Sequence, residues 1–250
     1  MLIYILLVLA LASPFSYRSS LASEKKGRDL VLLLDTSGSM GERGFNRSDK
    51  AQNKYEISVT LAKAFIAKRH DDNIGLVVFG TYAFSASPLT YDLKALSEMF
   101  YLMSDVGIAG ISTAIGDALM QGLRTLEGGE AKSKVLILLT DGKHNAGKNS
   151  PHQAVTLAKE RGVKVYTIGI GKKGDYDEEL LSTIAKESGA KSFFASTSNE
   201  LEDVYEEIEE LEPSDIRSEQ YFNKEEYFVY PLFLALLGLA LLLWRYEERE

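Results

Sequence analysis

The stretch LVLLLDTSGS, residues 30–39, joins a run of apolar residues to one carboxylate and two serine hydroxyls. A continuous apolar run bounded by turn residues is typical of a strand that is buried on both faces of a parallel sheet. Asp35, Ser37 and Ser39 are spaced two residues apart, so an extended loop would turn their side chains to the same side. All three offer oxygen, the ligand that a small hard cation such as Mg²⁺ requires. The stretch therefore predicts a buried strand that ends in a metal site.

Similar apolar runs recur along the chain. The strong ones cover residues 74–79, 134–140 and 164–170, and weaker ones cover residues 83–87 and 192–195. The run at 83–87 precedes a proline, which cannot donate to a sheet, so it suits an edge strand. These runs predict five strands in addition to the first.

Amphipathic stretches of helical period lie between the runs. They cover about 50–69, 93–103, 113–126, 151–161, 177–188 and 200–211. Strands that alternate with helices of this length predict an α/β fold, a doubly wound and mostly parallel six-stranded sheet with helices on both faces. In such sheets, ligands bind beyond the carboxyl ends of the strands, at the point where the strand order reverses.

Two later segments offer further oxygen donors at the expected edge of the sheet. Thr113 stands in GISTAIGD, residues 110–117, at the start of a predicted helix. Asp141 stands in LLTDG, residues 138–142, at the end of a predicted strand. Asp35 and Asp141 would both lie at carboxyl ends of buried strands, so the donors can meet at one site.

These residues resemble the metal-ion-dependent adhesion site (MIDAS) of the von Willebrand factor A (VWA) family, whose pattern is Asp-x-Ser-x-Ser, then Thr, then Asp. Asp35, Ser37, Ser39, Thr113 and Asp141 match all five positions. The resemblance implies a Rossmann-like domain and a Mg²⁺ or Mn²⁺ ion held directly by the serines and the threonine, with the carboxylates often acting through water. It also implies that an acidic residue from a protein ligand completes the coordination.

The chain is more closely similar to bacterial membrane proteins of the Bat (aerotolerance) type, BatA-like and BatB-like, which occur beside MoxR-type AAA+ ATPases. That similarity rests on residues 28–35, 74–79, 113–119, 165–171 and 177–181 and on the apolar C-terminal segment. Two features depart from the family pattern. Relatives usually carry more membrane sequence before the domain. Lys143 and His144 stand where an acidic or amide residue is common, which can alter the charge around the metal; for His144 alone we expect an exposed loop residue.

Both ends of the chain are apolar. Residues 228–244 contain no charge, would extend about 26 Å as a helix, and are flanked by aromatic residues, which predicts a transmembrane helix over 227–245. The shorter apolar segment near the N-terminus suits a signal peptide or an N-terminal membrane anchor, so both interpretations of residues 1–17 stay open. We expect a cell-membrane protein, single-pass or two-pass, with its domain outside the cytoplasm; an uncleaved N-terminal segment, followed by basic residues, would instead place the domain in the cytoplasm. The expected organisation is completed by a linker (18–27), the VWA domain (28–211), an acidic linker (212–226) and a short charged tail (246–250).

Composition excludes several classes of function. The chain has no cysteine, which excludes disulfides and thiolate metal sites. Its net charge is −8, and residues 200–226 carry most of the excess acid, so no basic stripe is available for nucleic acid. A GxxxxGK[ST] loop and a GxSxG elbow are absent from the sequence, and no dinucleotide-binding GxGxxG pattern follows the first strand.

We expect a binding protein rather than an enzyme. A phosphatase of the haloacid dehalogenase type would need a second carboxylate two residues after Asp35, and Ser37 cannot perform that proton transfer at neutral pH. The sequence therefore predicts a membrane-anchored domain that binds an acidic protein ligand through Mg²⁺, in a multiprotein complex linked to stress tolerance or envelope function. Alternatives are docking onto a MoxR-type AAA+ ATPase or sister VWA proteins without an adhesive role, a degenerate site without metal, and a metal-dependent phosphatase.

Overall fold

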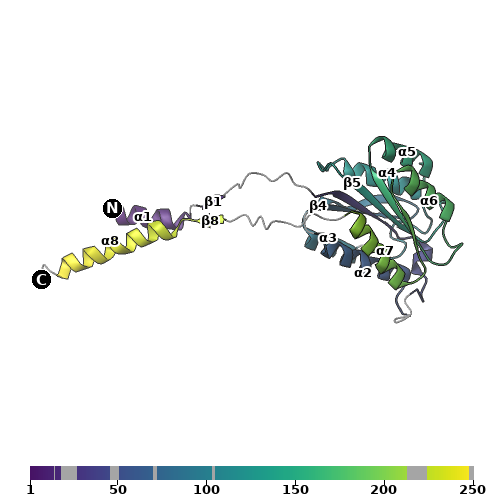
Figure 1. Cartoon of the computed structure of the whole chain (residues 1–250). Coiled ribbons are helices and arrows are strands. Elements are labelled where there is room, and N and C mark those ends of the chain that lie inside the picture. Colours follow the sequence, from purple (N-terminus) through teal and green to yellow (C-terminus); the bar gives the residue numbers. More distant parts are fainter. Residues whose placement is uncertain are drawn as a thin grey trace. The chain divides into compact units, whose positions relative to one another are not determined.

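The chain divides into two units, Lys25–Ile216 and a terminal unit formed by Met1–Glu24 with Arg217–Glu250. The structure is a computed structural model (Figure 1), and it describes residues 1–13, 15–17, 27–45, 51–69, 72–102, 105–212 and 224–247. The expected linkers at 18–27 and 212–226 lie mostly outside the described residues, as does the end of the tail at 246–250.

A six-stranded sheet with the order β4-β3-β2-β5-β6-β7 forms the centre of the larger unit. Its strands are β2 (Asp29–Asp35), β3 (Asn73–Phe79), β4 (Ala83–Thr90), β5 (Lys134–Thr140), β6 (Lys164–Ile170) and β7 (Ser192–Ala195). All neighbouring strands are parallel except β3 and β4. The predicted α/β fold with a mostly parallel six-stranded sheet is therefore confirmed. The chain passes from β2 to β3 on one side and later to β5 on the other, so the strand order reverses between β2 and β5.

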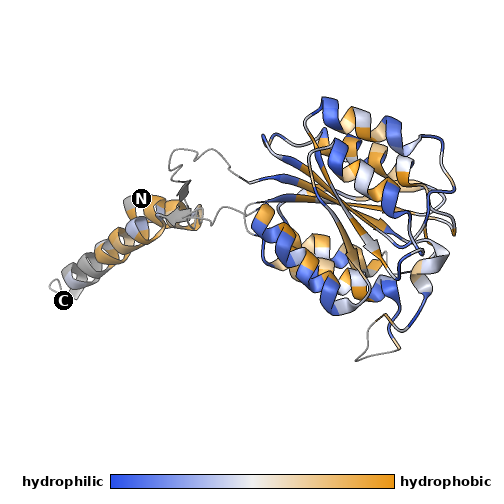
Figure 2. Cartoon of the chain, turned by 45° about the vertical axis from the view of Figure 1, so that its right-hand side comes forward, coloured by the Kyte–Doolittle hydropathy of each residue, from blue (hydrophilic) through white to orange (hydrophobic). Residues whose placement is uncertain are grey.

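Side chains alternate between the two faces of the sheet and build two apolar cores. From β2, Leu32 and Leu34 enter one core while Val31 and Leu33 enter the other. Three helices cover the first face: α2 (Lys54–Ala67), α3 (Leu93–Leu102) and α7 (Ser198–Leu211). Three cover the second: α4 (Ile115–Leu126), α5 (Pro151–Glu160) and α6 (Glu178–Glu187). Figure 2 shows apolar residues concentrated in the sheet and polar residues on the outer sides of the helices.

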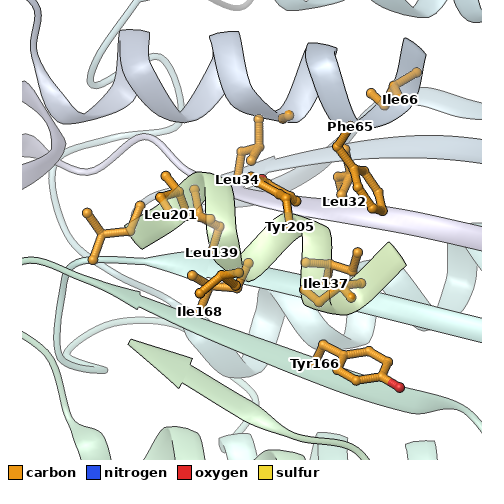
Figure 3. Close-up of a cluster of buried hydrophobic side chains, with 14 of the residues drawn as sticks. Leu32, Leu34, Phe65, Ile66, Ile137, Leu139, Tyr166, Ile168, Leu201 and Tyr205 are labelled. Carbon is orange, nitrogen blue, oxygen red and sulfur yellow. The ribbon is translucent and has the colours of Figure 1, made fainter. Parts of the chain in front are cut away.

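Aromatic and aliphatic side chains pack α2 and α7 against the first face of the sheet. The rings of Phe65 and Tyr205 lie 5.1 Å apart between the two helices, and Leu201 lies beside the strand residues Leu139 and Ile168 (Figure 3). These side chains are nearly inaccessible to water. Their burial holds the carboxyl ends of β2 and β5 in a fixed relation, since each buried apolar side chain contributes about 1.5–3 kcal/mol.

Two predicted element boundaries are wrong in a way that has a physical reason. The strand expected over 83–87 continues to Thr90 through Pro88, which an edge strand tolerates because the pairing of β4 with β3 is irregular near Leu76. The helix expected from Thr113 begins at Ile115, with Ala114 at the N-cap. Thr113 therefore belongs to the loop before α4.

The terminal unit contains α1 (Leu2–Leu11), β1 (Phe15–Tyr17), β8 (Lys224–Glu226) and α8 (Val229–Glu247). Strands β1 and β8 pair antiparallel, with Phe15 opposite Glu226. The helices α1 and α8 contact each other, and a Cβ atom on Gly238 would lie 3.2 Å from Cγ1 of Ile3. Within the residues that the structure describes, no helix combines the length and apolar character needed to cross a membrane, so the transmembrane helix expected over 227–245 is not supported.

Candidate metal centre

The two predicted carboxylates lie at the carboxyl ends of adjacent strands. Asp35 is the last residue of β2, and Asp141 directly follows β5. The two strands are paired in parallel, with Leu34 opposite Leu139. Both carboxylates therefore lie at the point where the strand order reverses, the usual ligand-binding edge of such a sheet.

Asp35 is completely buried, and protein groups bind both of its oxygens. Its Oδ1 accepts a hydrogen bond from the backbone N–H of Ser37 at 2.8 Å, and its Oδ2 accepts one from the Thr140 hydroxyl at 2.5 Å. Burial raises the pKa of Asp35 to about 6, although these hydrogen bonds act in the opposite direction. Asp35 therefore fixes the loop that follows β2.

Ser37 and Ser39 lie side by side, although the loop is not extended as predicted. Ser37 has an extended backbone, but a 3₁₀ helix, η1 (Gly38–Gly41), begins directly after it. The two serine Oγ atoms are 3.2 Å apart, and the Ser39 hydroxyl donates to Asp141 Oδ1 at 2.6 Å. A tight turn rather than strand-like alternation thus brings Ser37, Ser39 and Asp141 together.

Thr113 lies beside the turn that follows Asp141. Its N–H donates to Asn145 Oδ1 at 2.8 Å, and its C=O accepts from the Asn145 N–H at 3.0 Å. A Cβ atom at Gly142 would lie 2.7 Å from Thr113 Oγ1, so only glycine leaves room for this approach. Within the described part of the chain, the Thr113 hydroxyl makes no hydrogen bond to the other four predicted donors. Asn145, which the sequence patterns did not indicate, positions Thr113 from a neighbouring loop.

Backbone contacts join the three loops that carry the donors. The Gly107 N–H donates to the C=O of Thr36 at 2.6 Å, and the Gly38 N–H donates to the C=O of Ile111 at 3.1 Å. Asp117 stands in the first turn of α4, where its negative charge complements the helix dipole. Its carboxylate also accepts hydrogen bonds from the backbone N–H groups of Lys148 and Asn149, which fixes the loop after β5.

Lys54 is a site residue that sequence reasoning missed. Its Nζ lies 2.9 Å from Oδ2 of Asp141 and 2.7 Å from Oε2 of Glu42, and its side chain is 8% exposed. Burial opposes its charge, yet the hydrogen bonds to Glu42 and Asp141 raise the pKa of Lys54 above its ordinary value. One signal was available: a cation in the first turn of a helix opposes the helix dipole, so it needs a carboxylate partner.

His144 is more buried than predicted. Its side chain is half-buried, and its Nδ1 atom lies away from solvent without a hydrogen-bond partner among the described residues. Burial lowers the pKa of His144, while the nearby Asp117 charge raises it. The imidazole is therefore neutral at pH 7 and adds no positive charge beside the candidate site.

The donor set fits a hard divalent cation. It consists of two carboxylates and three hydroxyls, all oxygen donors of the kind that Mg²⁺ and Mn²⁺ accept. Over the ranges that the structure describes, no group of three or more histidine, cysteine, aspartate or glutamate side chains is arranged to hold a metal. A metal at this edge of the sheet would therefore depend on the hydroxyls of Ser37, Ser39 and Thr113.

Comparisons with known proteins identify the family of the chain. The family model described as "von Willebrand factor type A domain" matches residues 29–207. An uncharacterized protein from Borreliella burgdorferi is 33% identical over 176 residues, which are 70% of this chain and 50% of that protein, so the chain spans about half the length of this relative.

Two solved structures show the same fold. The conserved hypothetical protein BatB from Bacteroides thetaiotaomicron superimposes with a TM-score of 0.61 at 23% identity, over 74% of this chain and 98% of that one. Proximal thread matrix protein 1 from the mussel byssus, in a structure described as having a zinc-occupied MIDAS motif, gives a TM-score of 0.62 at 24% identity, over 82% of this chain and 49% of that one.

Proposed function

Since the chain belongs to the von Willebrand factor type A domain family, we propose that it binds a protein partner through a divalent cation, Mg²⁺ or Mn²⁺. In this proposal, Ser37, Ser39 and Thr113 hold the cation, and a carboxylate of the partner completes its coordination. The observation that carries the proposal is the contact between the Ser39 hydroxyl and Asp141, 2.6 Å apart although they are 102 residues apart in the chain. It brings the two halves of the motif into one site.

In this proposal, some site residues hold the cation and others position the loop that carries the donors. The three hydroxyls are the direct donors, whereas Asp35 uses both oxygens to bind Ser37 and Thr140 and so keeps the first loop in place. When bound, the cation supplies a Lewis-acidic position that accepts a carboxylate. The absence of a second carboxylate at position 37 favours binding over phosphate hydrolysis, because Ser37 cannot act as general acid or base at neutral pH.

Metal binding tests the first half of the proposal. We expect the full-length chain in detergent micelles to bind Mn²⁺, measured by electron paramagnetic resonance and calorimetry. Asp35→Ala and Ser39→Ala should weaken this binding at least tenfold with unchanged circular dichroism. Asp203→Ala, which removes an exposed carboxylate from α7, serves as the matched control and should have no effect. Equal Mn²⁺ affinity in all four proteins would refute the proposed metal site.

Partner binding tests the second half. A partner identified by cross-linking in cells that produce the chain, and then bound to the immobilised chain without a cross-linker, should be retained in Mg²⁺ and released by EDTA. Asp35→Ala should retain none, because the cation that joins the partner is lost. Retention that is insensitive to EDTA would show that binding does not depend on the metal. A hydrolysis assay with p-nitrophenyl phosphate in Mg²⁺ should show no turnover above the Asp35→Ala variant.

We also propose that the terminal unit attaches the chain to a membrane, where the domain takes part in a multiprotein complex linked to stress tolerance or envelope function. Large apolar side chains on both helices are exposed, among them Val8 and Leu9 on α1 and Phe233, Leu234 and Leu237 on α8. Exposed apolar surface of this kind marks contact with a protein or a lipid.

Membrane fractionation tests this attachment. The unaltered chain should stay in the membrane pellet after a carbonate wash, whereas the double variant Leu234→Asp/Leu237→Asp should be released, since both side chains are exposed and their replacement leaves the fold intact. Tyr82→Asp, at an exposed apolar residue of the larger unit, is the control and should stay in the pellet. Equal retention of the double variant would contradict membrane attachment through α8.

A further inference from the structure

The ammonium group of Lys54 lies between two carboxylates at the edge of the candidate metal centre. Lys54 is the first residue of α2, and its Nζ contacts Asp141 at 2.9 Å and Glu42 at 2.7 Å. The Asp141 side chain is fully buried, whereas that of Glu42 is 65% exposed. Water therefore screens the charge of Glu42 much more than that of Asp141. The main electrostatic partner of Lys54 is a predicted metal-site residue.

The protein backbone holds this ammonium group in place. The Lys54 N–H donates to the C=O of Glu42 at 2.9 Å, which ties the start of α2 to the residue that follows η1. Asn53 caps the same helix end, and its side chain accepts a hydrogen bond from the Glu56 N–H at 2.8 Å. Two hydrogen bonds thus fix the start of α2, from which the Lys54 side chain extends.

Lys54 and the serine loop share the two oxygens of Asp141. Oδ1 accepts the hydrogen bond from Ser39, while Oδ2 accepts the one from Lys54. An ammonium group so close to a metal-site carboxylate would repel a divalent cation placed against the serines, because like charges a few ångströms apart interact strongly at a partly buried site.

We propose that Lys54 supplies a fixed positive charge to this centre. It neutralises Asp141 in the metal-free protein and repels the divalent cation. The divalent cation is therefore held firmly only when a partner's carboxylate is bound as well. This inference rests on the proposed function. A divalent cation cancels the two buried charges of Asp35 and Asp141, and Lys54 then leaves the buried part of the site with one positive charge, which only the exposed and water-screened Glu42 offsets. An incoming carboxylate removes that excess, so cation and carboxylate each strengthen the binding of the other.

Substitution of Lys54 tests the inference. Mn²⁺ would be titrated into the full-length chain and into Lys54→Met, with and without acetate as the carboxylate probe, at constant ionic strength. We expect Lys54→Met to bind Mn²⁺ about tenfold more tightly, since the opposing charge is gone. The increase in Mn²⁺ affinity that acetate produces should be smaller in this variant than in the unaltered chain.

Two matched variants separate charge from other effects. Lys54→Arg keeps the positive charge and should bind Mn²⁺ like the unaltered chain. Lys68→Met removes an exposed lysine that lies just beyond the same helix and pairs with Glu206, and it should change nothing. Should Lys54→Met fail to fold, Lys54→Gln, which still donates a hydrogen bond, is measured instead with the same expected tightening.

The outcomes distinguish this inference from the proposed function. Unchanged or weaker Mn²⁺ binding in a folded Lys54→Met or Lys54→Gln variant would overturn the inference, because Lys54 would then only support Asp141, while the proposed metal site would stand. Absence of Mn²⁺ binding in the unaltered chain and in Lys54→Met would overturn both. Tighter binding with a reduced acetate effect supports the inference.

Discussion

Asp35 is a carboxylate enclosed by protein on all sides, and this enclosure controls when the centre can hold a cation. Burial raises its pKa to about 6, and burial also raises the pKa of Asp141 above the ordinary value. Divalent cations bind the ionised form of a carboxylate, so protonation of either residue competes with the metal. The metal centre should therefore respond to pH at values where ordinary carboxylates are already fully ionised.

We expect Mn²⁺ affinity to fall as the pH drops through about 6. At pH 7 most of the Asp35 carboxylate is ionised, whereas at pH 5 roughly a tenth is, so the dissociation constant should rise about tenfold between these values. Mn²⁺ titrations monitored by paramagnetic resonance at pH 5, 6 and 7 measure this change. A dissociation constant that is the same at pH 5 and pH 7 would show that Asp35 is ionised throughout and does not govern the site.

At the scale of single elements, the site depends on loops that approach each other closely. The turn after β5 passes so near to Thr113 that the position between them has to be a glycine. The hydrogen bonds of Asn145, three residues later in the same loop, also hold Thr113. The position of Thr113 is thus set by one loop about thirty residues further along the chain.

Gly142→Ala should weaken Mn²⁺ binding with little effect on stability. Its Cβ atom would lie 2.7 Å from Thr113 Oγ1, so the threonine side chain has to turn away from the site. We expect about a fivefold to tenfold loss of Mn²⁺ affinity and a change in unfolding free energy below about 1 kcal/mol. Calorimetry and urea unfolding measure the two quantities. Gly128→Ala, where a Cβ atom finds only ordinary contacts, is the control, and equal affinity in both variants would contradict the proposed role of Thr113.

The sheet and its helices were predictable because their signals are local. Continuous apolar runs marked β2, β3, β5 and β6 to within about one residue. The boundaries that failed depend on partners elsewhere in the fold. Pro88 continues β4 only because that strand lies at the edge of the sheet, and the tight turn η1 replaces the extended loop expected around Ser39.

The location of the motif residues at the carboxyl ends of adjacent strands followed from their spacing and order, but their supporting residues could not be predicted. Lys54 and Asn145 act through contacts with Asp141 and Thr113, which are distant in sequence, and neither belongs to a periodic pattern. His144 gave no indication of its burial for the same reason. Sequence patterns thus indicate which side chains can bind a cation, while the fold decides which charges surround it.

At the scale of the larger unit, a second charged cluster lies at the end of the strands that is opposite to the metal centre. The Glu212 carboxylate accepts hydrogen bonds from Lys164 at 2.5 Å and from Tyr166 at 2.8 Å, and it lies 2.9 Å from Nε of Arg28. The C=O of Glu212 accepts a hydrogen bond from Arg69, whose guanidinium is fully buried. The sequence predicts Glu212 at the start of the acidic linker. Its contacts thus connect both ends of the larger unit to α2 and β6.

The charge of Glu212 is favoured in this cluster. Burial alone would raise its pKa, but the hydrogen bonds from Lys164 and Tyr166 and the nearby cations lower it below the ordinary value. Glu212 is therefore ionised at pH 7 and compensates the positive charges of Arg28 and Lys164, whose side chains are 18% and 44% exposed. Removing one partner from such a cluster leaves the others buried without compensation, which costs more than the interaction itself contributes.

Glu212→Ala should destabilise the larger unit by about 3 kcal/mol while leaving the metal centre intact. The loss arises because Arg28 and Lys164 would keep their charges without the carboxylate that compensates them. Urea unfolding followed by circular dichroism measures the free energy, and Glu210→Ala, two residues earlier and exposed near the end of α7, is the control with an expected change below about 0.5 kcal/mol. Mn²⁺ affinity should be the same in both variants, because the two charged clusters lie at opposite ends of the strands.

Equal stability of the two variants would show that the cluster contributes no net stabilisation. A loss of Mn²⁺ affinity in Glu212→Ala alone would show that the end of α7 is coupled to the metal centre across the sheet.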